Sequence, residues 1–171
     1  MTLSDFLLKD AELSQQIRIP DNKIVLKKMA ALLAHSGDSW FLGAGLALLW
    51  VIGPRSWRPD IQLLFVGIVI TAVAVLVLKF SIKRPRPEGE WGQIYRSSDP
   101  HSFPSGHAAR VTMLTLLILL SGNIWLGLLM IFWTLLVVTA RVGLGVHYLS
   151  DIIAGIAIGT MFGGLAFLFF G

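Results

Sequence analysis

The sequence contains no cysteine among its 171 residues. This absence excludes disulfide bonds, thiolate metal sites and a cysteine nucleophile. Charged residues are also scarce, at 14% of the chain against about 25% in soluble domains, while hydrophobic residues reach 55%. The mean hydropathy is +0.74, which polar surface could not cover in a soluble fold of this size. The composition therefore predicts a single-domain integral membrane protein.

The chain has no basic stripe with interleaved aromatic residues, although its net charge is +4. Nucleic acid is therefore not an expected partner, and anionic headgroups or a phosphate substrate are the partners that the basic residues suit. Charged residues also interrupt the first thirty positions, where a signal peptide would carry an apolar stretch, so we expect no cleavable signal.

Uncharged runs indicate where the chain crosses the bilayer, because a spanning helix needs about 20 mostly apolar residues. Such runs occupy residues 39–54, 61–78, 111–140 and 152–171. The third run is too long for one helix, and the turn-forming sequence Ser121-Gly122-Asn123 divides it into two spans, about residues 105–120 and 124–141. Five spanning helices are therefore predicted.

The N-terminal segment has a different pattern. Residues 3–18 place apolar side chains at helical spacing between polar ones and end near Pro20, which predicts an amphipathic helix lying in the membrane interface. Residues 24–35 are short for a span and form either a sixth, tilted span or a second interfacial helix. The expected fold is all-α, an integral-membrane helical bundle of five to six transmembrane helices with an N-terminal amphipathic helix.

The five spans place the polar loops of residues 83–104 and 142–147 on one face of the membrane, together with residues 35–38. Six ionisable residues at span ends fall on this same face: Lys79, His107, Arg110, Arg141, His147 and Asp151. Each costs about 2.5–3.5 kcal/mol to insert near the membrane centre, so such residues are functional candidates. Snorkelling of long side chains to the headgroups would explain one of them, but six from four spans indicate a site.

His147 and Asp151 are spaced i, i+4 and share a helix face. A carboxylate that accepts the proton of one imidazole nitrogen leaves the other nitrogen free as a nucleophile or base, although a helix-capping pair is the alternative. Ser105 and Gly106 begin the span after the long polar loop, where free backbone N–H groups bind anions, and His107 adds a general acid beside them. A plain helix start is the alternative there.

Lys79, Arg86 and Arg141 supply three cations that suit phosphate oxygens. Together with the histidines and the aspartate they describe a pocket for phosphoryl transfer, which needs mainly positioning and charge stabilisation. Two histidines and an aspartate could also bind zinc, but three adjacent cations oppose a dication.

The chain resembles the type 2 phosphatidic acid phosphatase superfamily of membrane lipid phosphatases in a three-part signature. Lys, six residues and Arg-Pro are matched by Lys79, Arg86 and Pro87. Pro-Ser-Gly-His is matched by residues 104–107. Arg, five residues, His, three residues and Asp are matched by Arg141, His147 and Asp151. The one departure is Ala140, where the family usually has Ser, and the resemblance covers about residues 38–165.

The resemblance implies a metal-free mechanism without a cofactor. His147 would attack phosphorus and form a phosphohistidine, with Asp151 orienting its imidazole. His107 would protonate the leaving oxygen and then activate water. The phosphate oxygens would be held by Lys79, Arg86, Ser105, Gly106 and Arg141. Arg84 and Arg110 would be supporting or headgroup residues, and His35 and His101 would be surface groups.

We therefore expect a membrane lipid phosphatase whose substrate is undecaprenyl pyrophosphate, phosphatidylglycerophosphate or phosphatidic acid. A phosphotransferase with the same phosphohistidine and a non-catalytic lipid-phosphate binder are the alternatives. Residues 1–37 would form an N-terminal amphipathic or interfacial segment and residues 38–171 the lipid phosphatase transmembrane domain.

The orientation in the membrane depends on residues 24–35. If they span, the basic residues before them join Arg55 and Arg58 opposite the active site, and the positive-inside rule places the site outside the cytoplasm. If they lie flat, the argument reverses. We expect a site on the outer face of a bacterial inner membrane, as the resemblance implies.

Overall fold

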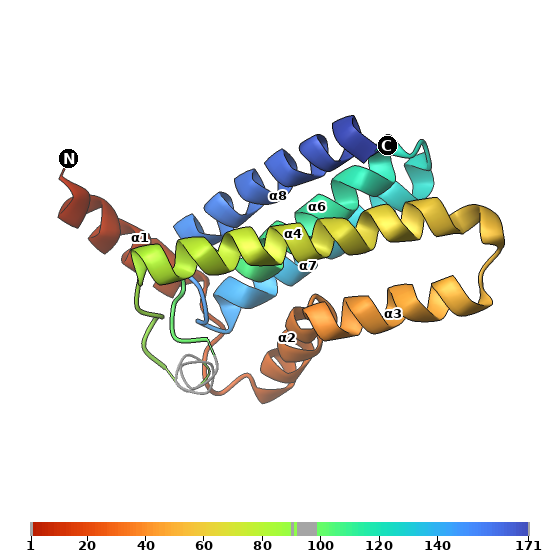
Figure 1. Cartoon of the computed structure of the whole chain (residues 1–171). Helices are drawn as coiled ribbons and strands as arrows, with labels where there is room; N and C mark the ends of the chain where they lie inside the picture. The colour runs from red at the N-terminus through yellow and green to blue at the C-terminus, as the bar shows by residue number, and fades with distance from the viewer. Residues whose placement is uncertain (1, 90, 92–98, 171) are drawn as a thin grey trace.

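The computed structural model describes residues 2–89, 91 and 99–170 and is a bundle of helices (Figure 1). The helices are α1 (Leu3–Ile17), α2 (Ile24–Ser36), α3 (Ser39–Ile52), the short η1 (Arg55–Trp57), α4 (Arg58–Ile82), α6 (Gly106–Leu120), α7 (Ile124–Gly143) and α8 (Leu149–Phe170). The only bridge between extended residues in these described parts joins Pro85 to His101. The all-α prediction is confirmed for the described chain.

Helix α6 is the centre of the bundle and packs against α4, α7 and α8. Its side chains are buried on several faces, and Val111 and Met113 are fully shielded. Leu114 and Leu117 pack with Ile68 of α4 in one apolar cluster. The residues at the start of α6 are therefore held in place from three sides.

Small residues let α8 approach α6 closely. Gly155, Gly159 and Gly163 recur at every fourth position of α8 and are all buried. A Cβ atom built on Gly159 would lie 2.2 Å from the carbonyl oxygen of Ala109 in α6. Repeats of small residues allow backbones to touch in this way in membrane helices. The contact fixes how far α8 can slide along α6.

The predicted hairpin between the third and fourth spans is confirmed. Helix α6 ends at Leu120 and α7 begins at Ile124. Gly122 has a φ of +86°, which glycine adopts without strain, and Asn123 caps α7 by accepting a hydrogen bond from the Leu126 amide at 3.2 Å.

Helix α2 starts and ends at the same end of the bundle. The amide of Ile19, before α2, donates to the Gly143 carbonyl at 2.8 Å. Asp38, after α2, contacts His107. With 13 residues the helix is about 20 Å long, against a hydrocarbon core of about 30 Å. These positions favour the interfacial interpretation of residues 24–35 over a sixth span.

Helix α1 begins with a capping box in which Thr2 and Asp5 exchange hydrogen bonds. Its apolar side chains are exposed, among them Leu3 and Leu8, whereas Asp10 and Ser14 are buried against the bundle. The amphipathic helix is therefore present as predicted, with polar side chains on its protein-facing side.

Three stretches are long and apolar enough to cross a membrane: Arg55–Ile82, Ile124–Gly143 and Leu149–Phe170. Two shorter apolar helices, Ser39–Ile52 and Gly106–Leu120, accompany them. The chain is an integral membrane protein. The C-terminal ends of α4 and α7 and the starts of α6 and α8 meet at one end of the bundle, as the sequence predicted (Figure 1).

Candidate active site

Charged side chains from three helices and a loop are buried together at this end of the bundle. Lys79 lies near the end of α4, Arg86 follows it in the loop, and Arg141 lies near the end of α7. The exposed fractions of Lys79, Arg86 and Arg141 are 3%, 2% and 1%. Asp151 in α8 is fully buried. Burial of charge at this depth is costly unless the groups are paired, so the pairing defines the site.

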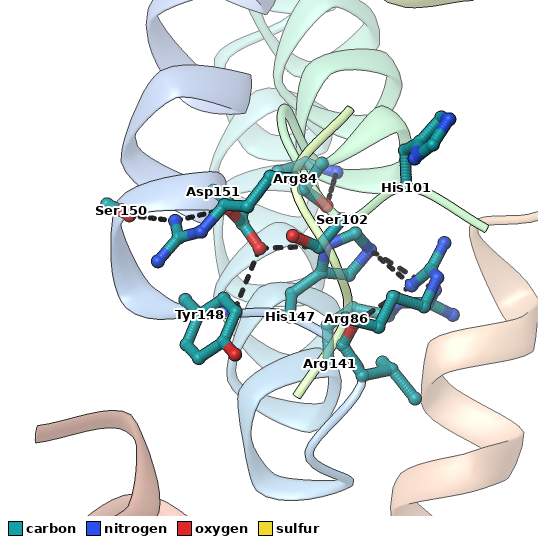
Figure 2. A network of polar contacts seen from close by, with 12 residues as sticks. Arg84, Arg86, His101, Ser102, Arg141, His147, Tyr148, Ser150 and Asp151 are labelled. Carbon is teal, nitrogen blue, oxygen red and sulfur yellow. Dashed lines mark hydrogen bonds and ion pairs between the residues drawn. The ribbon is translucent and has the colours of Figure 1, made fainter. Parts of the chain in front are cut away.

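His147 lies in the turn between α7 and α8 and is only 1% exposed. Its Nε2 atom lies 3.4 Å from Nη1 of Arg86 and 3.4 Å from Nη2 of Arg141 (Figure 2). Its Nδ1 atom lies 3.4 Å from Oδ2 of Asp151. One ring nitrogen therefore faces two guanidinium groups and the other faces a carboxylate.

The charge state of His147 follows from this environment. Burial lowers the pKa of His147 well below its usual value, and the positive charges of Arg141, Arg86 and Lys79 lower it further. The imidazole is therefore neutral at pH 7, and Nε2 keeps the lone pair that a nucleophile needs.

The Asp151 carboxylate is engaged at both oxygens. Oδ1 accepts from Nη1 of Arg84 at 2.8 Å, and Oδ2 accepts from the Tyr148 amide at 2.9 Å. The Ser102 side chain also hydrogen-bonds Asp151 (Figure 2). Arg84, which the sequence suggested only as a supporting group, is thus a direct partner of Asp151. The guanidinium of Arg84 also stacks 4.0 Å above the Tyr148 ring.

Lys79 and Arg86 share the carboxylate of Asp99, which lies in the loop before α6. Nη2 of Arg86 donates to Asp99 Oδ2 at 2.8 Å, and Lys79 forms an ion pair with the same oxygen. Lys79 also donates to the carbonyl of His101 at 2.9 Å, and Arg86 to that of Val146 at 2.8 Å. The two cations are therefore bridged by an anionic group.

His107 is held by a carboxylate outside the three-part signature. Its Nε2 atom lies 2.5 Å from Oδ1 of Asp38, whose other oxygen lies 2.9 Å from Nδ1 of His35. Burial alone would raise the pKa of Asp38, but hydrogen bonds from His107 and His35 hold it well below its usual range. The Asp38 carboxylate therefore fixes the orientation of the His107 ring.

Ser105 and Gly106 connect the start of α6 to α8. The Ser105 amide donates to the carbonyl of Asp151 at 3.0 Å, and its hydroxyl caps α6 by accepting from the Ala108 amide. A Cβ atom on Gly106 would lie 3.0 Å from Nη1 of Arg110. Ser105 therefore lies beside Asp151 and carries a structural bond, while Gly106 lies against Arg110.

Ala140, the departure from the signature, is buried in an apolar cluster with Ala30 and Ala34 of α2. Its methyl group packs where a serine hydroxyl would otherwise stand. The substitution therefore supports the packing of α2 on α7.

A cavity of about 390 Å³ borders His147 between α1 and the loops that follow α4 and α7. Its lining includes Ser14 and Arg18 from α1, and Glu88 and Gly145 from the loops. Arg18 donates to the Glu88 carbonyl at 2.7 Å. A polar space therefore adjoins the buried charges on the side that α1 covers.

Four polar residues lie at the site in the structure but were not predicted there from the sequence: Asp10, Ser14, Asp38 and Asp99. Each is a single polar residue in an N-terminal segment or loop, and no local spacing marks it. Their partners are distant in sequence, as with Asp10 and Arg84. His35 was expected at the surface and is exposed there, with its ring in contact with Asp38. His101 was also expected at the surface but is half-buried, and its carbonyl accepts from Lys79.

The donor set does not suit a metal ion. In residues 2–89, 91 and 99–170, no group of three or more His, Asp or Glu side chains is arranged to hold one. Asp151 is paired with Arg84, and Asp99 with Lys79 and Arg86, whereas Asp38 contacts His107 and His35.

The model of the PAP2 superfamily matches residues 60–171. The chain belongs to the PAP2 superfamily. The match contains all three parts of the signature and begins after α1 and α2, so Asp10 and Asp38 lie outside it. An undecaprenyl-diphosphatase of Sulfolobus acidocaldarius is 34% identical over 101 residues, which are 57% of this chain and 48% of that protein. The chain thus spans about half the length of this PAP2 relative.

Two solved structures share the PAP2 fold. Aquifex aeolicus LpxE has a TM-score of 0.74 at 22% identity, with 92% of this chain and 94% of that chain covered. A PAP2-type phosphatidylglycerolphosphate phosphatase of Bacillus subtilis has a TM-score of 0.79 at 22% identity, with 98% and 87% covered. At this identity the likenesses establish the fold, and α1 and α2 are included in it because nearly the whole chain aligns.

Proposed function

We propose that this PAP2 protein is a membrane lipid phosphatase that hydrolyses a phosphomonoester or diphosphate of a lipid through a phosphohistidine, without a metal ion. The observation that carries the proposal is the placement of His147. Its Nε2 atom faces the guanidinium groups of Arg86 and Arg141, and its Nδ1 atom faces Asp151. A neutral imidazole oriented in this way suits attack on a phosphoryl group that the same cations bind.

The reaction has two steps. Nε2 of His147 attacks phosphorus in line, the bond to the leaving oxygen breaks, and His107 gives that oxygen a proton. Asp151 stabilises the imidazolium that forms. His107 then takes a proton from water, whose oxygen attacks the phosphohistidine and releases inorganic phosphate. Lys79, Arg86 and Arg141 stabilise the charge on the phosphoryl oxygens in both steps, and Ser105 and the Gly106 amide add donors.

The substrate classes to compare are undecaprenyl pyrophosphate, phosphatidylglycerophosphate and phosphatidic acid. The first two choices are supported by relatives, which are named as an undecaprenyl-diphosphatase and a phosphatidylglycerolphosphate phosphatase. The polar cavity beside His147 offers space for a headgroup.

The first experiment measures phosphate release from these three lipids in detergent with EDTA present. Wild type is compared with His147→Ala, and Glu12→Gln, an exposed change on α1, is the control. We expect activity that survives EDTA and is lost only in His147→Ala, together with labelled phosphate trapped on the protein after acid quench. Activity that EDTA abolishes would overturn the metal-free mechanism. Transfer of label to an added lipid alcohol instead of water would identify a phosphotransferase.

We also propose that α3, α4, α6, α7 and α8 are the five spans and that α1 and α2 lie in the interface at the active-site end. The positive-inside argument for an outward-facing site required residues 24–35 to span the membrane. In the arrangement proposed here, Lys23 and Lys27 lie on the active-site side instead, and this argument no longer holds. The charge rule opposes the orientation that the family resemblance implies. Because the chain lacks cysteine, Ser56→Cys and Asn22→Cys can be labelled singly with an impermeant maleimide on intact cells. Labelling of Asn22→Cys alone would place the site outside.

A further inference from the structure

Asp10 is a buried carboxylate on a helix whose other residues are mostly exposed. Its exposed fraction is 6%, and among the described residues of α1 only Ser14 is buried with it. The residue lies outside the part of the chain that the PAP2 model matches. A buried charge in such a position needs strong partners.

The partners of Asp10 belong to the site. Oδ2 accepts from Nη2 of Arg84 at 2.7 Å and from the hydroxyl of Ser150 at 2.5 Å, and Oδ1 accepts from the Ser150 amide at 3.0 Å. The other terminal nitrogen of Arg84 donates to Asp151. One guanidinium therefore joins Asp10 to the carboxylate that faces His147. Figure 2 shows the contact between Arg84 and Asp151.

The same face of α1 caps α8. The first amides of a helix have no partner within it. Here the Leu149 amide donates to the Ser14 hydroxyl at 2.9 Å, and the Ser150 amide donates to Asp10. Ser14 is itself fixed by donating to the Asp10 carbonyl at 2.6 Å. The start of α8, which carries Asp151, is thus held by side chains of another helix.

Charge counting shows what Asp10 contributes. If Arg84 were paired with Asp151 alone, the pair would be neutral, and the positive charge of Arg84 would cancel the attraction of the Asp151 carboxylate for a protonated His147. With Asp10 present, two carboxylates share one guanidinium, and the group keeps one negative charge. That charge favours the imidazolium that develops as His147 takes up phosphate.

We propose that Asp10 is a positioning residue that acts through Arg84 and the start of α8 to hold and charge Asp151 against His147. The proposal rests on the proposed phosphatase function. It makes the interfacial helix α1 a functional part of the site and assigns it a role that the family signature does not contain.

The test is Asp10→Asn, which keeps the shape and one acceptor oxygen but removes the charge. Glu12→Gln, the same chemical change on the exposed side of α1, is the matched control. We expect the rate of phosphohistidine formation and kcat to fall about 10- to 100-fold, the usual effect of removing a partner that orients a reacting group. KM and inhibition by inorganic phosphate should stay within about twofold, because the phosphate-binding cations are untouched.

A double-mutant cycle separates positioning from general stability. Because Asp10 acts both through Arg84 and through the start of α8, adding Asp10→Asn to Arg84→Gln should lower kcat by a smaller factor than Asp10→Asn does in the wild type. Assays are run well below the midpoint of thermal unfolding of each variant. An unchanged kcat in Asp10→Asn, or losses that multiply in the double variant, would overturn the proposal.

The two proposals fail in different ways. An inactive wild type, or an active His147→Ala, would remove the phosphatase function itself. An active wild type with an inactive His147→Ala and a normal Asp10→Asn would remove only the role of Asp10.

Discussion

The contact between α6 and α8 can be tested at Gly155, one turn after Asp151. A Cβ atom at this position would lie 2.5 Å from the Ser105 carbonyl oxygen, 2.8 Å from the Ala108 Cβ and 3.2 Å from the Ala109 amide nitrogen. Ordinary contacts begin at 3.4 Å. These atoms belong to backbone or to a short side chain and cannot rotate away. Gly155→Ala must therefore move α8 from α6 by about 1 Å.

The magnitude follows from two opposing effects. Overpacking of this kind costs about 1–3 kcal/mol. Replacing glycine by alanine within a helix returns about 0.5–1 kcal/mol. We expect a net loss of about 1–2 kcal/mol, or a fall of about 2–8 °C in the midpoint of thermal unfolding for a chain of this length. The displaced backbone also joins Ser105 to Asp151. We therefore expect kcat of the folded variant to fall as well, by up to about 100-fold for a displacement of about 1 Å.

Gly164→Ala is the matched control, because it makes the same change on the same helix where nothing lies within 4 Å of the new Cβ atom. It should keep full activity and unfold at the same or a slightly higher temperature. Thermal unfolding in detergent and phosphate release at a temperature where both variants are folded provide the two readouts. If Gly155→Ala behaves like Gly164→Ala in both, the close packing of α6 on α8 is refuted.

Three further predictions concern the charges of the site. Asp38→Asn should lower the rate of phosphohistidine formation at least about tenfold for a lipid phosphate but hardly at all for p-nitrophenyl phosphate, whose leaving group needs no proton; equal losses in this first step would contradict the role of His107 as the acid. Asp99→Asn should strengthen inhibition by inorganic phosphate up to about fivefold, since a competing and partly exposed anion is removed, and weaker inhibition would be evidence against this competition. Because the pKa of His147 is lowered, kcat/KM should not fall as pH decreases from 7 through about 6.5. Folding stability should decrease over the same range, because His147 binds a proton in the unfolded chain but stays neutral in the folded chain. A kcat/KM that titrates near about 6.5, with a substrate whose own phosphate does not titrate there, would contradict the lowered pKa of His147.

The sequence predicted the parts of this protein that depend on spacing along one chain. The uncharged runs predicted where α4 and α7 end and where α8 begins. They therefore also predicted that Lys79, Arg141 and Asp151 lie at one end of the bundle. The turn before α7 followed from Gly122 and Asn123. These features are local, and the membrane forces the helices that carry them to run side by side.

The remaining features depend on tertiary contacts. Asp10 cannot be told from Glu12 by pattern, since both are acidic residues of an amphipathic helix. Only the docking of α1 decides that Asp10 meets Arg84, 74 positions later. The path of α2 was open for a similar reason, because its return to the active-site end is fixed by contacts at Gly143 and His107.

The exposed apolar side of α1 links catalysis to the state of the lipid surface. Leu3 and Leu8 are 75% and 70% exposed, and the same helix carries Asp10 on its other side. With α1 in the interface, as we propose, adsorption of α1 to a headgroup layer would be coupled to its docking on α8, and whatever strengthens adsorption would also strengthen docking. Turnover in this enzyme would then vary with lipid charge and headgroup packing even at a constant concentration of substrate, as in enzymes activated by an interface.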